Sequence, residues 1–506
     1  MPLGTALALI VFLAPGTTPG PSGDDTLRQL VSEARRAEKE ERLDDALAIY
    51  GRLLKTRGLP AQDVARLLAD RARLLQRKGE RRAALRELDR ALRYDPQNRE
   101  IRRFRAALCL DLGRVLQARR DLVSLVSRDP EDADAWYLYG LCLQRTGEPS
   151  EARRSFRRAI SLRPRFARAH CALGQMLEAA GDYQGALKEY SAAVDADPKM
   201  SLAHALRGAL LWKQGNTVEA IRELGEAVRL QPDRADAYLA RGIAFLSVGK
   251  TDQALADMNR ALELGLETPS LYIHRALAWK QAGKTDLALK DLDRALALDP
   301  GNLTARLNRG IILRAAGRLA DSLRDLQRAV ELNPSDAEAH YQLAVTRMRL
   351  GQPTLAMDEL QQALQIAPDH ARAWTAAGEL YLQQGYYRKA LEAFEKALNR
   401  DARLIPAYKG AARARMRLGE FSLAVAALDN ALRLTNDEEV LFLRARALYA
   451  LSDYTNALKS VDGVLDRHPD DPDALLLRAD VLEAQGEMEA ARRARNRARE
   501  LLEGTR

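Results

Sequence analysis

The sequence predicts an all-α solenoid, a stack of about 14 helix-turn-helix repeats that are each about 34 residues long. Two features carry this prediction, a recurrent proline and a set of small residues that return with the same period. A fixed period of this length indicates small units that pack on their neighbours rather than around one globular core. The recurrent prolines are Pro96, Pro130, Pro164, Pro198, Pro232, Pro300, Pro334 and Pro368, and Leu266 replaces the sixth of the series.

The small residues mark where the two helices of a repeat cross. With the proline placed at position 32 of the repeat, positions 8 and 20 are small, as two closely crossing helices require. Position 8 holds Ala72, Ala106, Gly140, Gly174, Gly208, Gly242, Ala276, Gly310, Ala344 and Gly378. Position 20 holds Ala84, Ala118, Ala152, Ala186, Ala220, Ala254, Ala288, Ser322, Ala356 and Ala390.

The turn between the two helices has its own recurrent residue at position 15. Glycine suits this place because the chain adopts a left-handed conformation after a helix ends. The residues are Gly79, Gly113, Gly147, Gly181, Gly215, Gly249, Gly283, Gly317 and Gly351. The second helix ends before the proline, since a residue that precedes proline avoids the helical region.

Counting by this period gives 14 repeats. The last of them has Arg495 at position 24, where the others have a large apolar residue, as expected for a terminal helix whose outer face meets water. The repeats are predicted to start near Thr26, Ala65, Arg99, Ala133, Ala167, Ser201, Ala235, Pro269, Leu303, Ala337, Ala371, Ile405, Glu438 and Pro472.

The repeat that starts at Ala133 shows the whole pattern. It has Trp136, Tyr139, Gly140, Leu143, Gly147, Ala152, Phe156, Ala159 and Pro164 at positions 4, 7, 8, 11, 15, 20, 24, 27 and 32. This pattern resembles the tetratricopeptide repeat (TPR), and the resemblance covers residues 25–503. It implies a right-handed superhelix, with the first helix of each repeat (helix A) along a concave face and the second (helix B) behind it. The family mostly supplies binding scaffolds, so the resemblance implies a protein or peptide partner.

The N-terminal segment, residues 1–24, differs from this array. An apolar run over 3–14 and a Thr/Pro/Gly/Ser stretch over 15–23 resemble a secretory signal and its linker, but the run follows no Lys or Arg. The layout favours export, and a disordered tail on a cytoplasmic protein is the alternative. The run is too short to cross a bilayer. The sequence thus predicts two parts, this segment and a continuous array over 25–503 that ends in a capping helix.

Composition sets broad limits on function. The chain of 506 residues has 79 Lys and Arg against 70 Asp and Glu, a net charge of +9, which permits acidic partners without indicating nucleic acid. Cys109, Cys142 and Cys171 lie within predicted helices and cannot form a closed set of disulfides, so we interpret them as small apolar residues.

A second periodic pattern predicts ion pairs between the two helices of a repeat. Arginine at position 7 recurs in six repeats, and each of these repeats has an acidic residue at position 23. Arginine suits a half-buried pair because its guanidinium group binds a carboxylate through two hydrogen bonds. This charge ladder consists of Arg71 with Glu87, Arg105 with Asp121, Arg207 with Glu223, Arg241 with Asp257, Arg275 with Asp291 and Arg309 with Asp325. Two repeats have the acid without the arginine, Leu173 with Glu189 and Leu343 with Glu359.

The resemblance places positions 5 and 9 of helix A on the concave face. Apolar residues at both positions predict a strip that binds a peptide segment, with core packing as the alternative. The residues are Tyr137 and Leu141, Leu239 and Ile243, Ile273 and Leu277, Leu307 and Ile311, and Tyr341 and Val345.

Motifs of catalysis are missing from the sequence, which contains no H-E-x-x-H, phosphate-binding loop or nucleophile elbow. We interpret His170, His204 and His340 at position 4 as wedge residues of helix A. The sequence therefore predicts a non-catalytic chain with no cofactor or metal site. An alternative function is binding of nucleic acid or another polyanion by the arginine-dense residues 99–168, although acidic residues are interleaved there and no aromatic platform accompanies them.

Overall fold

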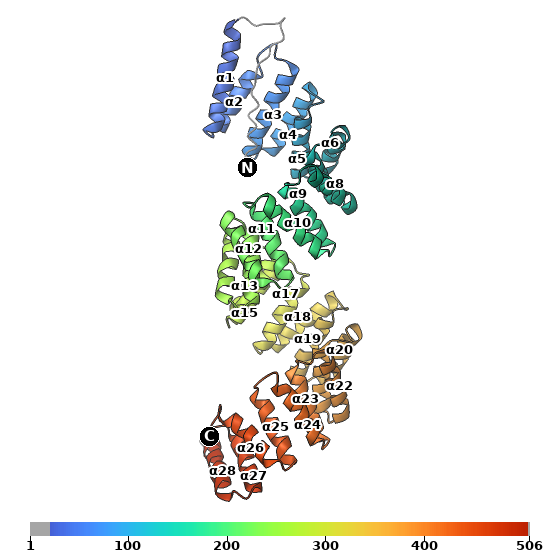
Figure 1. Ribbon diagram of the computed structural model, residues 1–506, viewed down its shortest axis with the longest axis vertical. Coiled ribbons are helices and arrows are strands. Elements are labelled where there is room, and N and C mark those ends of the chain that lie inside the picture. The colour runs from blue at the N-terminus through green and yellow to red at the C-terminus, as the bar shows by residue number, and fades with distance from the viewer. Residues whose placement is uncertain (1–20, 504–506) are drawn as a thin grey trace. The chain divides into compact units, whose positions relative to one another are not determined.

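The computed structural model describes residues 21–503, and within that range every regular element is a helix (Figure 1). The predicted all-α repeat fold is therefore confirmed. The chain divides into two compact units, an N-terminal unit that ends at Val248 and a C-terminal unit that begins at Gly249. The signal-like residues 1–20 lie outside the described residues. Helix α1 (Pro21–Lys39) begins inside the segment that the sequence assigns to the linker.

The described part of the N-terminal unit, from residue 21 onwards, contains seven A helices and six B helices. Its A helices are α1, α3 (Ala61–Arg77), α5 (Arg99–Asp111), α7 (Ala133–Arg145), α9 (Ala167–Ala179), α11 (Ser201–Lys213) and α13 (Ala235–Ser247). Its B helices are α2 (Leu43–Leu53), α4 (Arg81–Tyr94), α6 (Val115–Arg128), α8 (Pro149–Leu162), α10 (Tyr183–Ala196) and α12 (Thr217–Leu230).

The C-terminal unit continues the same alternation. Its A helices are α15 (Pro269–Gln281), α17 (Leu303–Ala315), α19 (Ala337–Arg349), α21 (Ala371–Gln383), α23 (Ile405–Arg417), α25 (Glu438–Ala450) and α27 (Pro472–Ala484). Its B helices are α14 (Thr251–Glu263), α16 (Thr285–Leu298), α18 (Leu319–Leu332), α20 (Pro353–Ile366), α22 (Tyr387–Arg400), α24 (Phe421–Leu432), α26 (Tyr454–Leu465) and α28 (Met488–Glu503).

The A helices from α5 to α27 begin at the residues that the sequence predicts as repeat starts. The first two A helices begin earlier than predicted, at Pro21 rather than Thr26 and at Ala61 rather than Ala65. At α3 the reason is local, because extended Pro60 (φ −54°, ψ 143°) precedes the helix and allows it to begin directly afterwards.

Local interactions fix the ends of the helices. Side chains at the N-cap of several A helices accept a hydrogen bond from the first turn; for example, Asp132 Oδ1 accepts from the Ala135 amide at 3.0 Å. The glycines at position 15 have positive φ, such as 77° at Gly147 and 79° at Gly385, which confirms the predicted left-handed turn. In the thirteenth repeat Ser452 takes this place, with φ 61°.

The core of each repeat is a contact between position 8 on helix A and position 24 on helix B. Where position 24 is aromatic, position 8 is glycine, as in Gly140 beneath Phe156 and Gly378 beneath Phe394. A Cβ atom added to Gly378 would lie 2.7 Å from the Phe394 ring. Where leucine occupies position 24, position 8 is alanine in five repeats and glycine in two. An aromatic side chain at position 24 therefore goes with glycine at position 8, whereas leucine leaves room for alanine.

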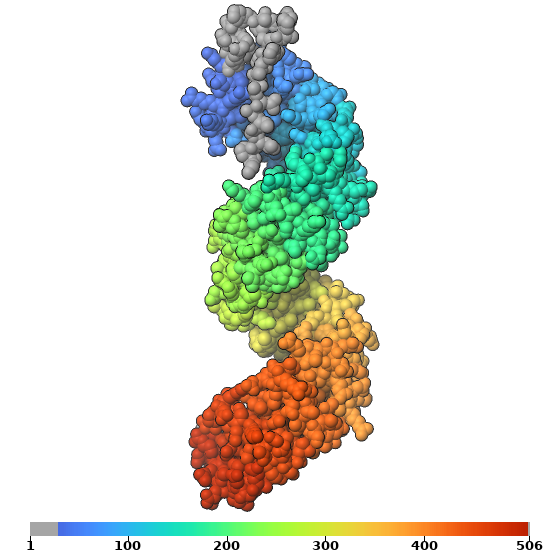
Figure 2. Space-filling model, viewed as in Figure 1, coloured from blue at the N-terminus to red at the C-terminus, as the bar shows by residue number. Residues whose placement is uncertain are grey.

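Helix A lies on the inner side of the curve within each unit. The most extensive contacts join the two helices of one repeat, such as α3 with α4 and α21 with α22. Successive A helices also touch each other, as α9 touches α11 and α21 touches α23, whereas successive B helices make no contact of comparable extent within the described residues. Repeats follow one another in space as they do in sequence inside each unit (Figure 2).

Candidate functional site

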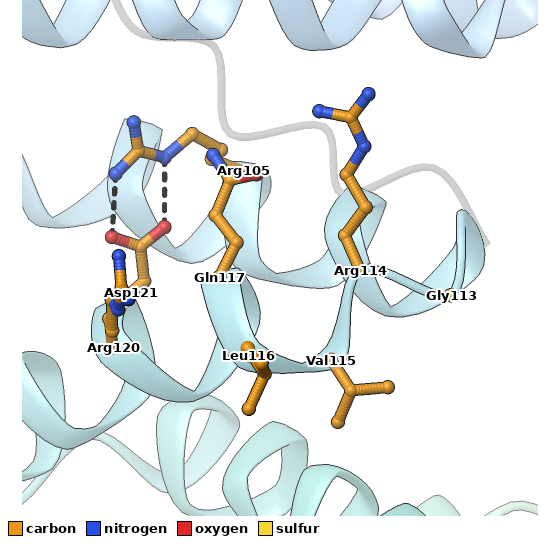
Figure 3. Close-up of a pocket in the computed structure, with 8 residues that line it drawn as sticks. All are labelled: Arg105, Gly113, Arg114, Val115, Leu116, Gln117, Arg120 and Asp121. Atoms are coloured by element: carbon orange, nitrogen blue, oxygen red, sulfur yellow. Dashed lines mark hydrogen bonds and ion pairs between the residues drawn. The ribbon is translucent and has the colours of Figure 1, made fainter.

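In the five repeats whose two ladder partners belong to one unit, the arginine nitrogen and the carboxylate oxygen lie within 3.5 Å of each other. Arg105 binds Asp121 through two hydrogen bonds of 2.8 and 2.7 Å (Figure 3). The same two-bond arrangement recurs, at 2.8 and 2.6 Å for Arg275 with Asp291 and at 2.6 Å twice for Arg309 with Asp325. Arg207 lies 2.5 Å from Glu223, and Arg71 lies 3.5 Å from Glu87. Arg241 and Asp257 belong to different units, so their pair remains a prediction.

These arginines also reach the preceding repeat. Arg105 Nη1 donates to Asp89 at 2.9 Å, and Arg309 Nη1 donates to Asp293 at 2.6 Å. In both cases the acceptor lies 16 residues before the arginine, on helix B of the repeat before. The ladder therefore links neighbouring repeats as well as the two helices of one repeat.

Two C-terminal arginines each bind only one acidic residue of the described chain, and it lies on helix B of the preceding repeat. Arg444 and Arg478 stand at position 7 in repeats without an acid at position 23. Arg444 Nε donates to Asp429 at 2.6 Å, and Arg478 Nε donates to Asp462 at 2.7 Å, both on the preceding helix B. These two pairs therefore also link helix A of one repeat to helix B of the repeat before it.

Histidines at position 4 explain the two exceptions in the ladder pattern. His170 Nδ1 lies 2.7 Å from Glu189 Oε2, and His340 Nδ1 lies 2.5 Å from Glu359 Oε2. His204 makes the same contact with Glu223 at 2.8 Å. The interpretation of these histidines as wedge residues missed this contact. The sequence contained a signal for it, namely a position-23 glutamate in repeats that lack the arginine.

The position-4 side chain also caps the recurrent proline. In seven described repeats, including that of Arg102 and Pro96, it carries a ring or guanidinium nitrogen that faces the carbonyl oxygen of the proline six residues earlier. The distances are 3.0 Å for Trp136 to Pro130, 2.9 Å for His170 to Pro164, 3.1 Å for His204 to Pro198, 2.7 Å for Arg306 to Pro300, 3.1 Å for His340 to Pro334 and 3.0 Å for Trp374 to Pro368. The two recurrent positions are thus one structural element, a hydrogen bond that joins the loop to helix A.

The His170 ring lies between two acceptors, so it is expected to favour the doubly protonated form. The hydrogen bond to Glu189 raises the pKa of His170 above its ordinary value, desolvation opposes this, and the Pro164 carbonyl adds to it. Stability from a raised folded-state pKa is complete below the unfolded pKa of about 6.5 and is lost as the pH rises through the folded-state pKa. We expect His170→Gln to lose more unfolding free energy, relative to the wild type, at about pH 6 than at about pH 9. An NMR titration that places the His170 pKa at or below its unfolded value would contradict this expectation.

The predicted groove residues are not uniformly accessible. In the C-terminal unit Leu277, Leu307, Ile311, Tyr341 and Val345 are half-buried. Ile273 is only 5% exposed, so it belongs to the core and is removed from the surface that a partner could contact. In the N-terminal unit Tyr137, Leu141, Leu239 and Ile243 are half-buried.

The two groove tyrosines also pack on neighbouring repeats. The Tyr137 ring centroid lies 5.1 Å from that of Phe166, and the Tyr341 centroid lies 5.0 Å from that of His370. The Arg372 guanidinium lies 5.3 Å from the Tyr341 ring. Both tyrosines therefore present one part of the ring to the groove and use another part to join repeats.

Charged residues also lie on the helices of the apolar strip and on the next A helix. Arg314, on the same helix as Leu307 and Ile311, donates to the side chain of Gln342 at 2.6 Å, and burial lowers the pKa of Arg314. On α21, desolvation raises the pKa of the Glu379 carboxyl group, while Arg413, Arg349 and Lys409 oppose that shift.

Two models of one repeat family match the sequence, both described as "Tetratricopeptide repeat". One matches residues 69–122, 110–153, 143–201, 206–265, 239–302, 275–337, 307–371, 409–458 and 442–502, and the other matches residues 371–403. The chain belongs to the tetratricopeptide repeat family. The TPR matches cover most of the described helices. A search of curated proteins finds no match to the chain.

Solved TPR structures are similar to this chain at low sequence identity. The anaphase-promoting complex hetero-tetramer Cut9–Hcn1 is 15% identical with a TM-score of 0.47, and the match covers 91% of this chain and 96% of that chain. Yeast Tom70 is 16% identical with a TM-score of 0.43, covering 85% and 95%. YrrB, a TPR protein with an unusual peptide-binding site, is 24% identical with a TM-score of 0.32, covering 37% and 97%.

The described TPR helices contain neither a metal-binding cluster nor a helix able to span a membrane. No cluster of three His, Cys, Asp or Glu residues in this part of the chain has an arrangement that could hold a metal ion. No helix among the described residues has the length and hydropathy that crossing a bilayer requires.

Proposed function

We propose that this TPR protein is a non-catalytic scaffold that binds a peptide or protein segment along the inner face of its A helices. One observation carries the proposal, the half-buried apolar residues at positions 5 and 9 on α17 and α19, with Leu277 on α15 beside them. Apolar side chains that remain partly accessible on consecutive helices offer contacts to a partner without being required to complete the core.

The arrangement favours a segment with spaced apolar side chains. Leu307 and Ile311 stand four residues apart on one helix, so both point to the same side of it. Tyr341 and Val345 repeat this spacing on the next A helix. A helical or extended segment that lies across these helices would place its apolar side chains between them. TPR proteins generally bind protein partners, which supports this assignment.

The test compares two double variants of the full chain by affinity capture from a native lysate. Leu307→Gln/Ile311→Gln changes the groove, and Ile273 is left unchanged because it is buried. Loss of two apolar contacts is expected to weaken partner binding by about tenfold or more, at ~1 kcal/mol per side chain. Mass spectrometry would then show specific partners captured by the wild type and lost from the variant.

The matched control is Leu355→Gln/Leu423→Gln. These two leucines are 47% and 51% exposed and lie on B helices, outside the groove. The control is expected to retain the partners of the wild type, and circular dichroism establishes that both variants are folded. Equal capture by the groove variant and the wild type would refute the proposed site.

A further inference from the structure

The positive charge of this chain is concentrated in one region. Residues 81–170 contain 21 arginines and 12 acidic residues, a net charge of +9, which equals the net charge of the whole chain. The remaining residues are therefore balanced in charge. This region lies entirely in the N-terminal unit, over helices α4 to α9.

Part of this charge forms a row along five consecutive B helices. Position 22 is cationic and exposed in each of them, and we call these residues the cationic row: Arg86, Arg120, Arg154, Lys188 and Arg222. The C-terminal unit has no such unbroken row, because position 22 changes to Asp358 and Glu392 there.

The cationic row is available for a ligand. Arg86, Arg120 and Lys188 form no ion pair with another described residue of the chain. Arg154 pairs with Glu151 one turn away, and the Arg154 side chain remains 73% exposed. The Arg222 side chain is 76% exposed and lies 3.5 Å from Glu223, whose carboxylate already binds Arg207 and His204.

Half-buried arginines nearby behave differently. Figure 3 shows the Arg105 guanidinium held by two hydrogen bonds to Asp121, whereas Arg114 at the start of α6 extends away from this pair. The ladder arginines are thus held by carboxylates within the repeats. Arg86, Arg120 and Lys188 of the cationic row have no such partner among the described residues. They differ in this from other exposed arginines of the region such as Arg99 and Arg163, which pair with Asp129 and Asp134.

The spacing of the row indicates what it can bind. Successive B helices of the described chain are not in close contact, so the cations of the row lie at least as far apart as directly packed helices, about 10 Å or more. An extended peptide advances about 3.3–3.6 Å per residue, so carboxylates on every third residue, about 10 Å apart, can each approach one cation of the row. Arginine also matches carboxylate geometry through paired hydrogen bonds. We propose that the cationic row binds an extended, carboxylate-rich segment of a protein partner.

Nucleic acid and membranes fit the row less well. A nucleic acid strand carries a phosphate about every 3.4 Å along its axis and would also place phosphates against Glu151 and Glu219, next to the row. Strand binding further uses an aromatic side chain at successive bases, and only two of these five described B helices have an exposed aromatic residue, Tyr94 on α4 and Tyr183 on α10. A flat membrane cannot follow a row on the outer side of a curved unit.

The test measures binding of a fluorescent 15-residue peptide with glutamate at every third position and glycine or serine elsewhere. Fluorescence anisotropy with the full chain at low salt is expected to show binding that weakens as salt increases. Arg86→Gln/Arg120→Gln/Arg154→Gln is expected to reduce affinity about tenfold, at up to about 0.5 kcal/mol for each exposed contact. The same peptide with glutamine in place of glutamate is expected not to bind.

The matched control removes the same charge at the same repeat position elsewhere. Lys290→Gln/Arg324→Gln/Lys459→Gln changes three exposed position-22 cations that are outside the row, and it is expected to bind like the wild type. Equal losses in both variants would show that net charge alone attracts the peptide and would overturn the proposal. Binding of oligothymidylate or phosphatidylserine vesicles without binding of the glutamate peptide would overturn it too.

The groove proposal and the row proposal can fail separately. The row lies on B helices of the N-terminal unit, and the groove residues Leu307 and Ile311 lie on an A helix of the C-terminal unit. Leu307→Gln/Ile311→Gln is therefore expected to leave binding of the glutamate peptide unchanged.

Discussion

Phe394→Ala is expected to lower the unfolding free energy by about 3–5 kcal/mol, because it removes a fully buried aromatic side chain and leaves a cavity. The Phe394 ring fills the space between Gly378 on α21 and Gly410 on α23 of the next repeat. Cβ atoms added at either glycine would clash with the Phe394 ring, so the ring joins two repeats at once. Urea unfolding, with hydrogen exchange of α21 to α23 as a local probe, measures the loss.

A compensating variant tests the reason for that loss. Gly378→Ala/Phe394→Leu recreates the pair that Ala344 and Leu360 form in the preceding repeat. We expect the double variant to be more stable than Gly378→Ala or Phe394→Ala alone. As a control, Tyr386→Ala is expected to change stability by less than about 1 kcal/mol, since Tyr386 is 55% exposed. A double variant less stable than both single variants would show that compensation of volume does not govern this crossing.

The second large effect is expected at the most buried pair of the charge ladder. The Arg275 and Asp291 side chains are 13% and 8% exposed, and the Asp291 carboxylate raises the pKa of Arg275. Asp291→Ala leaves the guanidinium in a half-buried site, with a hydrogen bond to the Asn259 side chain and the face of the Tyr272 ring as its remaining side-chain contacts. We expect a loss of about 2–3 kcal/mol in urea unfolding, below the loss for a completely buried pair because water reaches part of Arg275.

Replacing both partners distinguishes the contribution of the two charges from that of the buried volume they fill. Arg275→Met/Asp291→Leu removes the charges and fills the volume, so we expect it to recover most of the stability lost in Asp291→Ala. Glu267→Ala is the exposed control, because Glu267 and Arg294 are about half exposed and such a pair contributes less than about 1 kcal/mol. If Asp291→Ala costs no more than Glu267→Ala, the ladder does not stabilise the stack.

Features that depend on near neighbours in the sequence were predictable. The starts of the A helices from α5 onwards, the left-handed turns such as Gly147, and the 16-residue spacing between Arg105 and Asp121 all follow from one repeat pattern. Each depends on geometry within one helix pair, and the pattern repeats often enough to average out local variation. The early start of α3 was missed because Pro60 acts outside that pattern.

Other features required the neighbouring repeat to be in place. Ile273 occupies position 5 like Leu307, yet it is buried while Leu307 remains half-buried. The identity of a residue at one position does not specify which atoms of adjacent helices cover it. The bond from Arg309 back to Asp293 has the same origin, since it exists only when one repeat is stacked on another.

The sequence by itself determined the repeat length, the pairing of helices and the position of each turn, because these depend on local backbone preferences and on side-chain volume at fixed positions. Only the tertiary structure decided which arginines are held between repeats and which face water, since this depends on distances between chain segments of different repeats. It also decided that position-4 side chains form hydrogen bonds with the recurrent prolines. The sequence does not reveal this contact, because every recurrent position of the repeat returns after 34 residues and a shared period therefore does not indicate which positions touch.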